Sequence, residues 1–330
     1  MKLTVLTRAD VQQAVSMAQA IEAVKSAFAQ LSAGRANVPL RIQLLVPKHE
    51  GVTLFMPAYL EETDSLAVKV VSVFAGNPGR GLPTIHALVL VVDASTGAPV
   101  AIMDGTYLTA LRTGAAAGAA TDLLARRDAR RVAILGAGTQ GRTQLLAMCE
   151  VREITRVRVY DALRARAEEY VAEMKAQGGR VPADVAASAS STEAVADADI
   201  VCTATTSTTP VLRDADLKLG VHINGIGAYT PQMQEVDEAT VARARIVVDS
   251  RPACLAEAGD LIIPLRKGLI TEQSIHAELG EIVLGRKAGR QNERQVTFFK
   301  SVGNAVQDAA VARLALQFAT AQGLGMQVEL

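Results

Sequence analysis

The pattern of apolar residues changes near Arg130, and the two parts of the chain predict different architectures. After Arg130, short apolar runs alternate with helical segments, which is typical of β-α-β units and a doubly wound parallel sheet. Helices are expected between the strands, for example at Arg164–Ala176 and Thr192–Ala198. The expected strands are 131–135, 156–161, 200–205, 221–226, 245–249 and 295–299, with a weaker one near 181–187.

Before Arg130, the chain predicts one helix followed by strands that no helix separates. Ser16 and Gln19 form a capping-box pattern, an apolar stripe follows at helical spacing, and Gly34 ends the helix. A second helix is expected from near Thr109 through an alanine-rich stretch. Runs bounded by proline, glycine and asparagine turns predict strands of an antiparallel or mixed sheet, at Arg41–Val46, Val52–Met56, Leu66–Phe74 and Ile85–Val92.

The end of the chain predicts a return to the first part. A last helix at about Gly303–Ala319 carries apolar residues four apart. Because this helix follows the last expected strand, it can pack back on the N-terminal part. We therefore expect an α/β protein with one domain at 119–304 and a discontinuous α+β domain at 1–118 and 305–330.

The run 131–141 carries the most specific chemical signal, an apolar strand that leads into G-x-G-x-x-G. Gly136 permits a tight turn, Gly138 lets the backbone approach a pyrophosphate, and Gly141 lets the next helix pack close to the strand. The helix N-terminus then offers free N–H groups to phosphates. A glycine turn of an ordinary α/β unit is the simpler alternative, but strand, glycines, helix and a later acid together predict a Rossmann dinucleotide site.

That acid is Asp161, which ends a second apolar strand twenty residues after the last glycine. Its carboxylate is expected to accept hydrogen bonds from a ribose and to repel a 2′-phosphate, which favours NAD(H). Asp161 could instead cap the next helix. Arg164 and Arg166 follow closely and could accommodate a 2′-phosphate, so NADP(H) stays possible.

Composition narrows the class of protein. The 330 residues include 34 basic and 34 acidic ones without a long run of one sign, which argues against nucleic acid or an anionic membrane as a partner. We find no signal-peptide pattern and no long uncharged apolar window, so we expect a cytoplasmic protein without a membrane span. The four histidines lack metal-ligand spacing, and no metal site is predicted.

Three widely spaced cysteines indicate a reduced protein rather than a disulfide framework. Cys149 and Cys202 have apolar neighbours in the sequence and are expected to pack in the core. Cys254 follows Arg251 and Pro252 and is expected to be more exposed. Nothing in the sequence pairs Cys254 with a base, so a catalytic thiol is the weaker interpretation.

Taken together and in order, the motifs resemble the ornithine cyclodeaminase/μ-crystallin family over nearly the whole chain. Each motif alone is common, and their order makes the resemblance specific. The motifs are Met56-Pro57-Ala58, Val68–Val71, Asn77-Pro78 with Gly81–Thr84, Asp93 with Thr96-Gly97, Leu108–Thr113, Gly136–Gly141, Asn224–Gly227 and Thr297–Gly303.

The resemblance implies a Rossmann domain inserted in a substrate-binding and dimerisation domain, a homodimer, and hydride transfer between a nicotinamide and the α-carbon of a small amino or imino acid. It implies that Arg41, Lys69 and Arg112 surround the substrate. It also implies a set of cofactor contacts: Thr84, Arg112, Thr113, Gly136, Gly138, Thr139, Gln140, Gly141, Asp161, Thr203 and Ser301, with Asn224, Gly225 and Ile226 beside the nicotinamide.

The chemistry of the three cations agrees with these roles. Two guanidinium groups can bind a substrate carboxylate in bidentate fashion. Lys69 lies inside an apolar strand, and burial would lower its pKa toward the range that suits proton exchange with an imine nitrogen. The alternatives are a strand lysine that points to water, and for Arg41 a surface arginine. Arg112 stands near the expected helix start, where the helix dipole disfavours a cation.

One position departs from the family pattern. In cyclodeaminases an aspartate two residues before a proline does acid/base work, and here Tyr229 holds that place before Pro231. A phenol is a poor base near neutral pH, but Tyr229 is still expected to contact the substrate, by donating a hydrogen bond or lining an apolar pocket. The sequence therefore favours an NAD(P)H-dependent reductase of a cyclic imino acid such as Δ1-pyrroline-2-carboxylate. The alternatives are ornithine cyclodeaminase, an alanine-type amino-acid dehydrogenase and, less favoured, a crystallin-like binding protein without activity.

Overall fold

The structure, a computed structural model, describes residues 2–330. The chain divides into two compact units, one that combines the chain up to Arg112 with Ala305–Leu330, and one that comprises Thr113–Asn304. The first unit is discontinuous because the chain leaves it at Arg112 and returns at Ala305. The boundaries expected at 118/119 and 304/305 for folding domains stay a prediction.

The first unit contains a mixed sheet with the strand order β16-β1-β7-β6-β5-β4-β2, and β3 also pairs with β4. Only β1 and β7 pair in parallel, so the expectation of an antiparallel or mixed sheet is confirmed. The strands are β1 (Lys2–Leu6), β2 (Ala36–Asn37), β3 (Ile42–Val46), β4 (Gly51–Leu60), β5 (Ser65–Phe74), β6 (Ile85–Val92), β7 (Pro99–Asp104) and β16 (Met326–Glu329).

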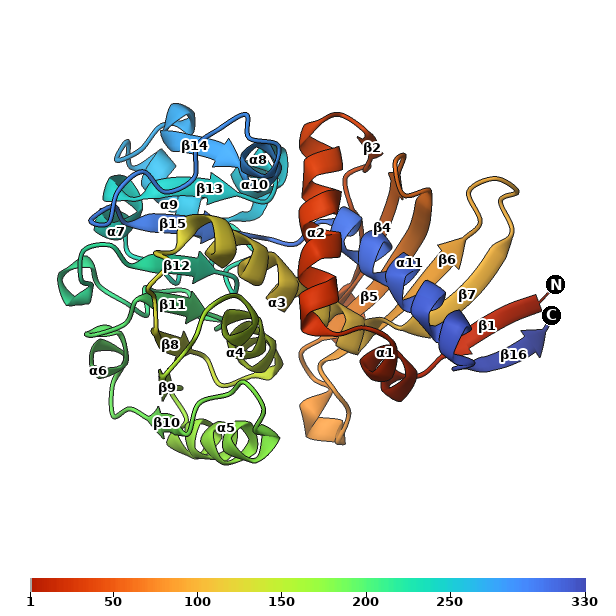
Figure 1. Ribbon diagram of the computed structural model, residues 1–330, viewed down its shortest axis with the longest axis horizontal. Helices are drawn as coiled ribbons and strands as arrows, with labels where there is room; N and C mark the ends of the chain where they lie inside the picture. The colour runs from red at the N-terminus through yellow and green to blue at the C-terminus, as the bar shows by residue number, and fades with distance from the viewer. Residues whose placement is uncertain (1) are drawn as a thin grey trace. The chain divides into compact units, whose positions relative to one another are not determined.

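Helices cover one face of this sheet, where α2 and α11 pack on each other and on β4 (Figure 1). The predicted capping box is present, since Ser16 and Gln19 each accept a hydrogen bond from the other's backbone N–H. The helical segments of this unit are α1 (Arg8–Ala14), α2 (Met17–Ser32), η1 (Pro47–His49), η2 (Pro78–Arg80) and α11 (Ala305–Gln322).

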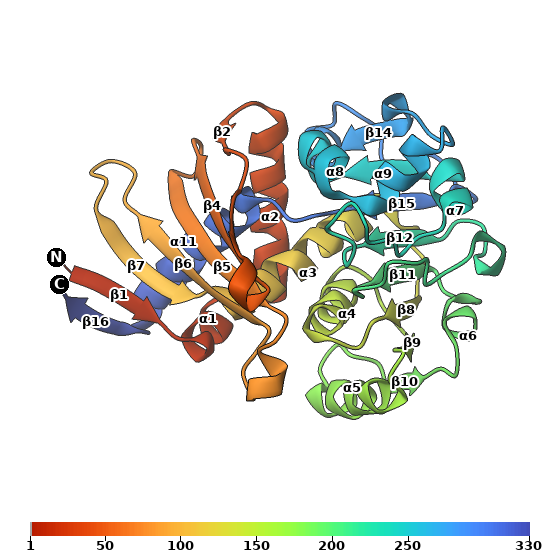
Figure 2. The ribbon, with the colours of Figure 1, turned by 180° about the vertical axis from the view of Figure 1, so that it is seen from behind.

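The opposite face of the sheet is apolar and exposed, and Figure 2 shows the unit from behind. Lys69 shares the helix-covered face with Met56 and Val89, its register partners on β4 and β6. The residues that alternate with them face outward: Ile42 on β3 is 64% exposed, and Leu88 on β6 is 45% exposed. Both faces of the sheet are therefore apolar, which a monomer in water would disfavour.

Helix α3 (Gly105–Leu124) runs from the first unit into the second. It begins at Gly105 rather than near Thr109, so Arg112 lies two turns inside the helix. The expectation that Arg112 stands near a helix start was wrong, and the dipole argument for its role falls with it. The helix can begin at this position because residue 105 is glycine. A Cβ there would lie 2.7 Å from the backbone of Ala87 and would clash with it.

The second unit is a doubly wound parallel sheet, as predicted, with the order β10-β9-β8-β11-β12-β15-β13-β14. The sequence did not predict β14, whose four residues include two polar ones. The strands are β8 (Arg131–Leu135), β9 (Arg156–Tyr160), β10 (Asp184–Ala187), β11 (Ile200–Thr203), β12 (His222–Gly225), β13 (Arg245–Val248), β14 (Ile275–Glu278) and β15 (Thr297–Lys300).

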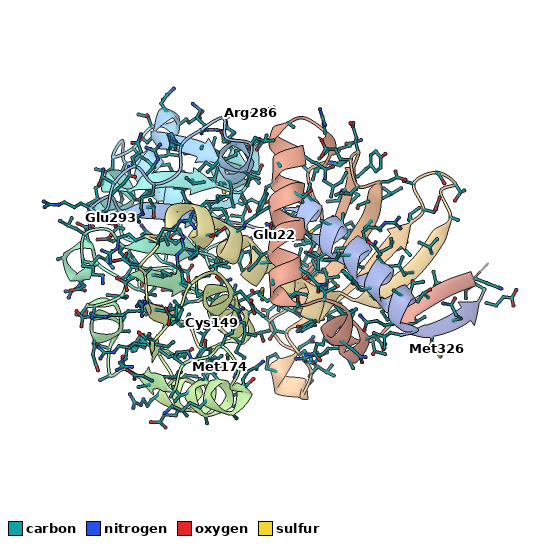
Figure 3. The ribbon with its side chains drawn as sticks, in the orientation of Figure 1. Glu22, Cys149, Met174, Arg286, Glu293 and Met326 are labelled. Carbon is teal, nitrogen blue, oxygen red and sulfur yellow. The ribbon has the colours of Figure 1, made fainter. Side chains whose placement is uncertain are left out.

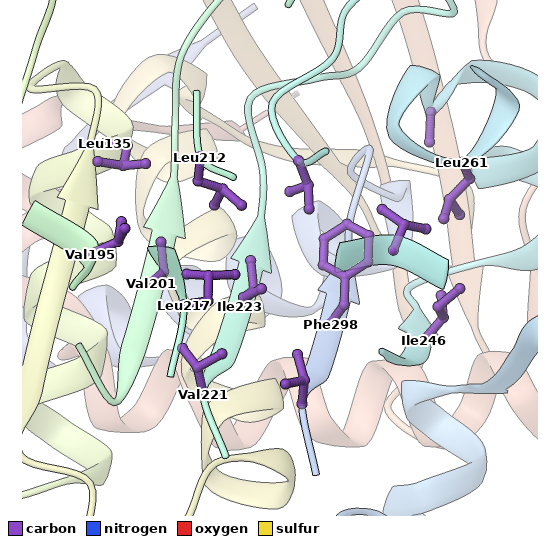
Figure 4. Close-up of a cluster of buried hydrophobic side chains, with 14 of the residues drawn as sticks. Leu135, Val195, Val201, Leu212, Leu217, Val221, Ile223, Ile246, Leu261 and Phe298 are labelled. Atoms are coloured by element: carbon purple, nitrogen blue, oxygen red, sulfur yellow. The ribbon is translucent and has the colours of Figure 1, made fainter. Parts of the chain in front are cut away.

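Buried aliphatic side chains and Phe298 form the core beside this sheet (Figure 4). In the residues described, none of the helices combines the length and apolar character that a membrane crossing requires. The helical segments of the second unit are α4 (Thr139–Val151), α5 (Arg164–Gln177), α6 (Ser191–Val195), η3 (Asp214–Asp216), α7 (Glu238–Arg243), α8 (Arg251–Glu257), α9 (Gly259–Arg266), η4 (Glu272–Ser274) and α10 (Leu279–Val283).

All three cysteines are buried thiols without a disulfide. Cys149 lies on α4 (Figure 3), and Cys202 lies on β11. Cys254 is also fully buried, so the expectation that it is more exposed was wrong. Its neighbours Arg251 and Pro252 begin helix α8, which turns the Cys254 side chain inward, where its Sγ lies 3.2 Å from Asp249 Oδ1.

Candidate functional site

The glycine loop after β8 has the geometry that a dinucleotide needs. Gly136 has a φ of +103°, and a Cβ there would lie 2.5 Å from the carbonyl oxygen of Ala204. A Cβ at Gly141 would overlap the carbonyl oxygen of Gly136, so helix α4 packs directly on the turn. At Gly138, in contrast, a Cβ would meet no protein atom within 4 Å. The backbone of Gly138 is therefore open to a close ligand, as the motif predicts.

A cavity of about 690 Å³ lies beside this loop, lined by Gly136 and Gly138 and by Asp161 and Arg166 from the next strand and helix. Helix α4 begins at Thr139, and no side chain caps it. Its first N–H groups are therefore available to a phosphate. Gln140 Oε1 is buried without a protein partner, which leaves an acceptor for a ligand beside the loop.

Asp161 lines this cavity and accepts hydrogen bonds from backbone N–H groups. Its carboxylate accepts hydrogen bonds from the backbone N–H of Ala137 and of Leu163, both at 2.9 Å. The N-cap of α5 is Leu163, so the alternative that Asp161 caps this helix does not hold. Each carboxylate oxygen retains a lone pair that can accept from a ribose hydroxyl.

Arg164 and Arg166 differ in their surroundings. Arg164 donates to Glu168 at 2.8 Å and to the carbonyl oxygen of Ser188 at 3.0 Å. Arg166 instead lines the cavity beside Asp161. Of the two arginines that could bind a 2′-phosphate, Arg166 is the better candidate because it lines the cavity.

The other predicted cofactor residues of this unit stand at the ends of parallel strands, where α/β sheets bind ligands. Thr203 ends β11, Gly225 ends β12, and Ile226 follows it. Asn224 is fully buried and donates to Thr121 Oγ1 at 3.0 Å. Ser301, after β15, donates to Asp249 at 2.7 Å.

Two further predicted contacts, Thr113 and Thr84, do not stand at the ends of these strands, and Arg112 is described below with Lys69. Thr113 is buried on α3, and its carbonyl oxygen accepts from Gln144 at 3.4 Å. Thr84 lies before β6 in the first unit, and its carbonyl oxygen accepts from the N–H of Phe74 at 2.9 Å.

In the first unit, Lys69 and Arg112 meet on one carboxylate. Lys69 Nζ lies 2.7 Å from Asp308 Oδ2, and Arg112 Nε donates to Asp308 Oδ1 at 2.9 Å. Arg112 Nη1 also donates to Gln307 Oε1 at 2.6 Å. Lys69 is 2% exposed and Asp308 is 2% exposed, so the alternative that Lys69 points to water is wrong.

The cluster lowers the pKa of Lys69 to about 8. Burial is the main cause, the positive charge of Arg112 adds to it, and the carboxylate of Asp308 opposes both. The charge of Arg41 also lowers this pKa, so Arg41 acts on Lys69 electrostatically. The three predicted cations thus form one electrostatic group. With two cations paired to one carboxylate, this group has an excess of positive charge that an anionic substrate can neutralise.

The sequence did not predict Asp308 or Gln307. Both lie near the start of α11, where four consecutive residues from Val306 are buried. An aspartate in the first turn of a helix usually interacts with the helix dipole, so nothing in the local pattern marks Asp308 as a partner for Lys69. Gln307 Nε2 is buried without a protein partner and is a further donor open to a ligand.

Tyr229 lies in the second unit and is 44% exposed. The carboxylate that contacts this segment belongs to Glu235, which accepts from the backbone N–H of Gly227 and of Ala228. Both oxygens of Glu235 already accept hydrogen bonds from the protein, so this carboxylate is occupied within the second unit. The segment therefore supplies no exposed carboxylate where cyclodeaminases carry one.

Known proteins resemble this chain over nearly its full length. The family model for the ornithine cyclodeaminase/mu-crystallin family matches residues 1–322. A Delta(1)-pyrroline-2-carboxylate reductase from Bacillus cereus is 38% identical over 328 residues, which cover 99% of this chain and 100% of the reductase.

Solved structures agree. The Thermococcus litoralis Delta(1)-pyrroline-2-carboxylate reductase, in complex with NADH and L-proline, has a TM-score of 0.94 and 45% identity, over 98% of this chain and 100% of that one. An archaeal alanine dehydrogenase dimer with bound NAD has a TM-score of 0.92 and 35% identity, over 100% of both chains. The family expected from the motifs is thus confirmed: this chain belongs to the ornithine cyclodeaminase/mu-crystallin family.

Proposed function

We propose that this chain is an NAD(P)H-dependent reductase of a cyclic imino acid of the Δ1-pyrroline-2-carboxylate type, with L-proline or a similar product. The observation that carries the proposal is the buried group in which Lys69 and Arg112 share the carboxylate of Asp308. The relatives support it, because the Bacillus cereus protein is named as a reductase of this imino acid and the Thermococcus litoralis structure holds NADH and L-proline.

The substrate-facing residues would divide the work. Arg112 and Arg41 would bind the carboxylate of the imino acid, since guanidinium groups match carboxylate oxygens. Lys69, with a pKa lowered to about 8, is largely protonated at neutral pH and can give a proton to the imine nitrogen. Gln307 Nε2 is a further donor for a polar substrate group. A bound reduced nicotinamide supplies the hydride that the α-carbon accepts.

The residues around the glycine loop fit such a cofactor. Gly138 and the N-terminus of α4 would hold the pyrophosphate, and Gln140 Oε1 would accept a hydrogen bond. Asp161 would accept from the adenosine ribose. The segments after β11 and β12 would lie beside the nicotinamide.

The absence of a carboxylate at Tyr229 favours reduction of a preformed imine over cyclodeamination. Cyclisation of ornithine needs a base for the transfer of protons between nitrogens, whereas imine reduction needs only hydride and one proton. We expect purified protein to consume NADH or NADPH with Δ1-pyrroline-2-carboxylate and to release little ammonia from L-ornithine. Absorbance at the nicotinamide band and an ammonia assay measure the two activities. Robust ammonia release from L-ornithine without imine reduction would contradict the proposal.

For the cofactor, we expect NADH to bind at least as tightly as NADPH, because Asp161 disfavours a 2′-phosphate. Arg166→Ala should raise the KM for NADPH by about 10-fold and leave the KM for NADH nearly unchanged, since Arg166 lines the cavity. Arg164→Ala is the matched control, because Arg164 is paired with Glu168. A loss of NADH use in Arg166→Ala equal to the loss of NADPH use would exclude phosphate recognition.

We further propose a homodimer formed through the open face of the first unit's sheet. Ile42 and Leu44 of β3 are 64% and 57% exposed, and the archaeal relative is a dimer. Light scattering should give a dimer for the wild type, and the double variant Ile42→Lys/Leu44→Lys should be a monomer at micromolar concentration. Leu163→Lys, an exposed leucine of the second unit, is the control and should remain dimeric. A monomeric wild type would overturn the proposal.

A further inference from the structure

A buried carboxylate joins the ends of two neighbouring strands in the second unit. Glu235 Oε1 accepts from the N–H and the hydroxyl of Thr205, at 2.6 and 2.8 Å. Glu235 Oε2 accepts from the hydroxyl of Thr203 at 2.9 Å and from the N–H groups of Gly227 and Ala228 at 2.7 and 2.9 Å. One oxygen thus holds the segment after β11, and the other mainly holds the segment after β12.

The contact leaves no room for a side chain at Gly227. A Cβ at Gly227 would overlap both the carbonyl oxygen of Thr205 and Glu235 Oε1. The two segments approach each other this closely because Gly227 has no side chain and because Glu235 accepts from N–H groups of both, although the N–H of Gly227 also donates to the carbonyl oxygen of Thr203 at 3.2 Å.

A second carboxylate fixes Glu235 itself. Asp260 Oδ1 accepts from the N–H of Glu235 at 2.7 Å and from that of Val236 at 3.0 Å. Asp260 Oδ2 accepts from Lys300 Nζ at 2.8 Å, and both side chains are fully buried. Lys300 ends β15, the strand beside β12, so the network spans three adjacent parallel strands (Figure 1).

This hydrogen-bond network lies at the strand ends where the nicotinamide is expected to bind. Under the proposed function, Thr203 and the segment Asn224–Ile226 bear on the nicotinamide, and Glu235 contacts both strand ends directly. We infer that Glu235 is a positioning residue for the nicotinamide, which it aligns by holding the ends of β11 and β12 in one fixed arrangement. This inference rests on the proposed function only for the identity of the bound group, because the hydrogen bonds themselves lie within the second unit.

The chemistry of an amide makes Glu235→Gln a sharp test. Three of the five donors are backbone N–H groups, which cannot accept a hydrogen bond. Glutamine has one oxygen, so its NH₂ group must face either Thr205 N–H or the N–H groups of Gly227 and Ala228. One of the two segments must therefore lose its backbone hydrogen bonds to residue 235, although the side-chain volume is unchanged.

Asp199 is a matched control, because it lies at the amino ends of strands in the same sheet. Asp199 precedes β11, and its Oδ2 accepts from the N–H groups of Arg130 and Arg131 at the start of β8, both at 2.9 Å. It too is a buried carboxylate that braces two neighbouring strands, but at their amino ends. Asp199→Asn should therefore destabilise the unit without disturbing the nicotinamide end.

The experiment compares wild type, Glu235→Gln and Asp199→Asn. In Glu235→Gln, amide hydrogen exchange without cofactor should become at least tenfold faster at 203–207 or 226–229. The kcat with NADH should fall by about 30-fold or more, because small misalignments of reacting atoms cost this much. The dissociation constant for NADH should rise less than fivefold, since the phosphate and ribose contacts are retained, and a deuterium isotope effect from NADH labelled at C4 should increase.

Asp199→Asn should leave exchange at 203–207 and 226–229, kcat and the isotope effect within about twofold of wild type. Unchanged exchange in Glu235→Gln, or an equal fall of kcat in Asp199→Asn, would overturn the inference. If Glu235→Gln does not fold, Thr205→Val removes one of the five hydrogen bonds and also the one that Ser207 N–H donates to Thr205 Oγ1, so exchange is then read at 226–229. Unchanged exchange at 226–229 and unchanged kcat in Thr205→Val would likewise overturn the inference. A wild type that reduces no imine refutes the proposed function alone, and the exchange comparison still decides the role of Glu235.

Discussion

Replacing Lys69 by methionine is expected to lower kcat for imine reduction by about 10³-fold, the range of a lost general acid. Methionine fills nearly the same apolar volume, and the glycine loop belongs to the other unit, so we expect the removal of the amine to leave the loop unchanged. The dissociation constant for NADH, measured by nicotinamide fluorescence, should therefore stay within about twofold of wild type. Retention of most of the turnover would show that another group supplies the proton.

Lys69→Arg and the pH profile separate proton donation from simple charge. Because Lys69 has a pKa lowered to about 8, its protonated fraction falls as pH rises through 8. Imine reduction by the wild type should thus decline about 10-fold per pH unit above that value. Arg remains protonated across this range, so Lys69→Arg should lack this decline and show a low, nearly flat rate.

Replacing Asp308 by asparagine is expected to have the second large effect. It leaves Lys69 and Arg112 buried side by side without their shared counter-ion, and breaking a buried ion pair costs about 3–5 kcal/mol of folding free energy. The carboxylate also raises the pKa of Lys69, so its loss should move the alkaline limb of the pH profile below pH 8. Urea unfolding and the pH dependence of kcat/KM measure the two effects.

The double variant Lys69→Met/Asp308→Asn is the control for this interpretation. The double variant leaves one buried cation, Arg112, without its counter-ion instead of two, so it should be more stable than Asp308→Asn alone. It should remain as inactive as Lys69→Met. An Asp308→Asn variant with wild-type stability and an unmoved pH profile would show that Asp308 has no part in tuning Lys69.

The sequence predicted the second unit better than the first, and the reason lies in the kind of signal. Strands of a parallel sheet are buried on both faces and read as short apolar runs, so β8 and β11 were found within one or two residues. In the first unit, β2 has two residues, and β16 is mostly exposed at the sheet edge. Short or exposed strands carry little apolar pattern, because the sheet that stabilises them is assembled from distant parts of the chain.

The candidate site shows the same division. Local backbone geometry fixes the glycine loop, and its three glycines could be assigned from spacing alone. Lys69 was recognised as unusual inside an apolar strand. Periodicity did not decide which face of the sheet its side chain lies on, because both faces of β5 are apolar. Only packing on α11 decides it, and Asp308, which lies 239 positions later in the sequence, completes the ion pair.

By itself, the sequence determined the Rossmann sheet, the glycine loop with its acid, and the family, because each depends on residues near one another or on motifs in order. Only the tertiary structure decided that Cys254 is buried, that Arg112 lies inside a helix, that Asp308 pairs with Lys69 and Arg112, and that Glu235 accepts from the segments after β11 and β12. Buried charges acquire partners through folding, since the free energy of burial depends on which distant group neutralises them. No local pattern records that choice.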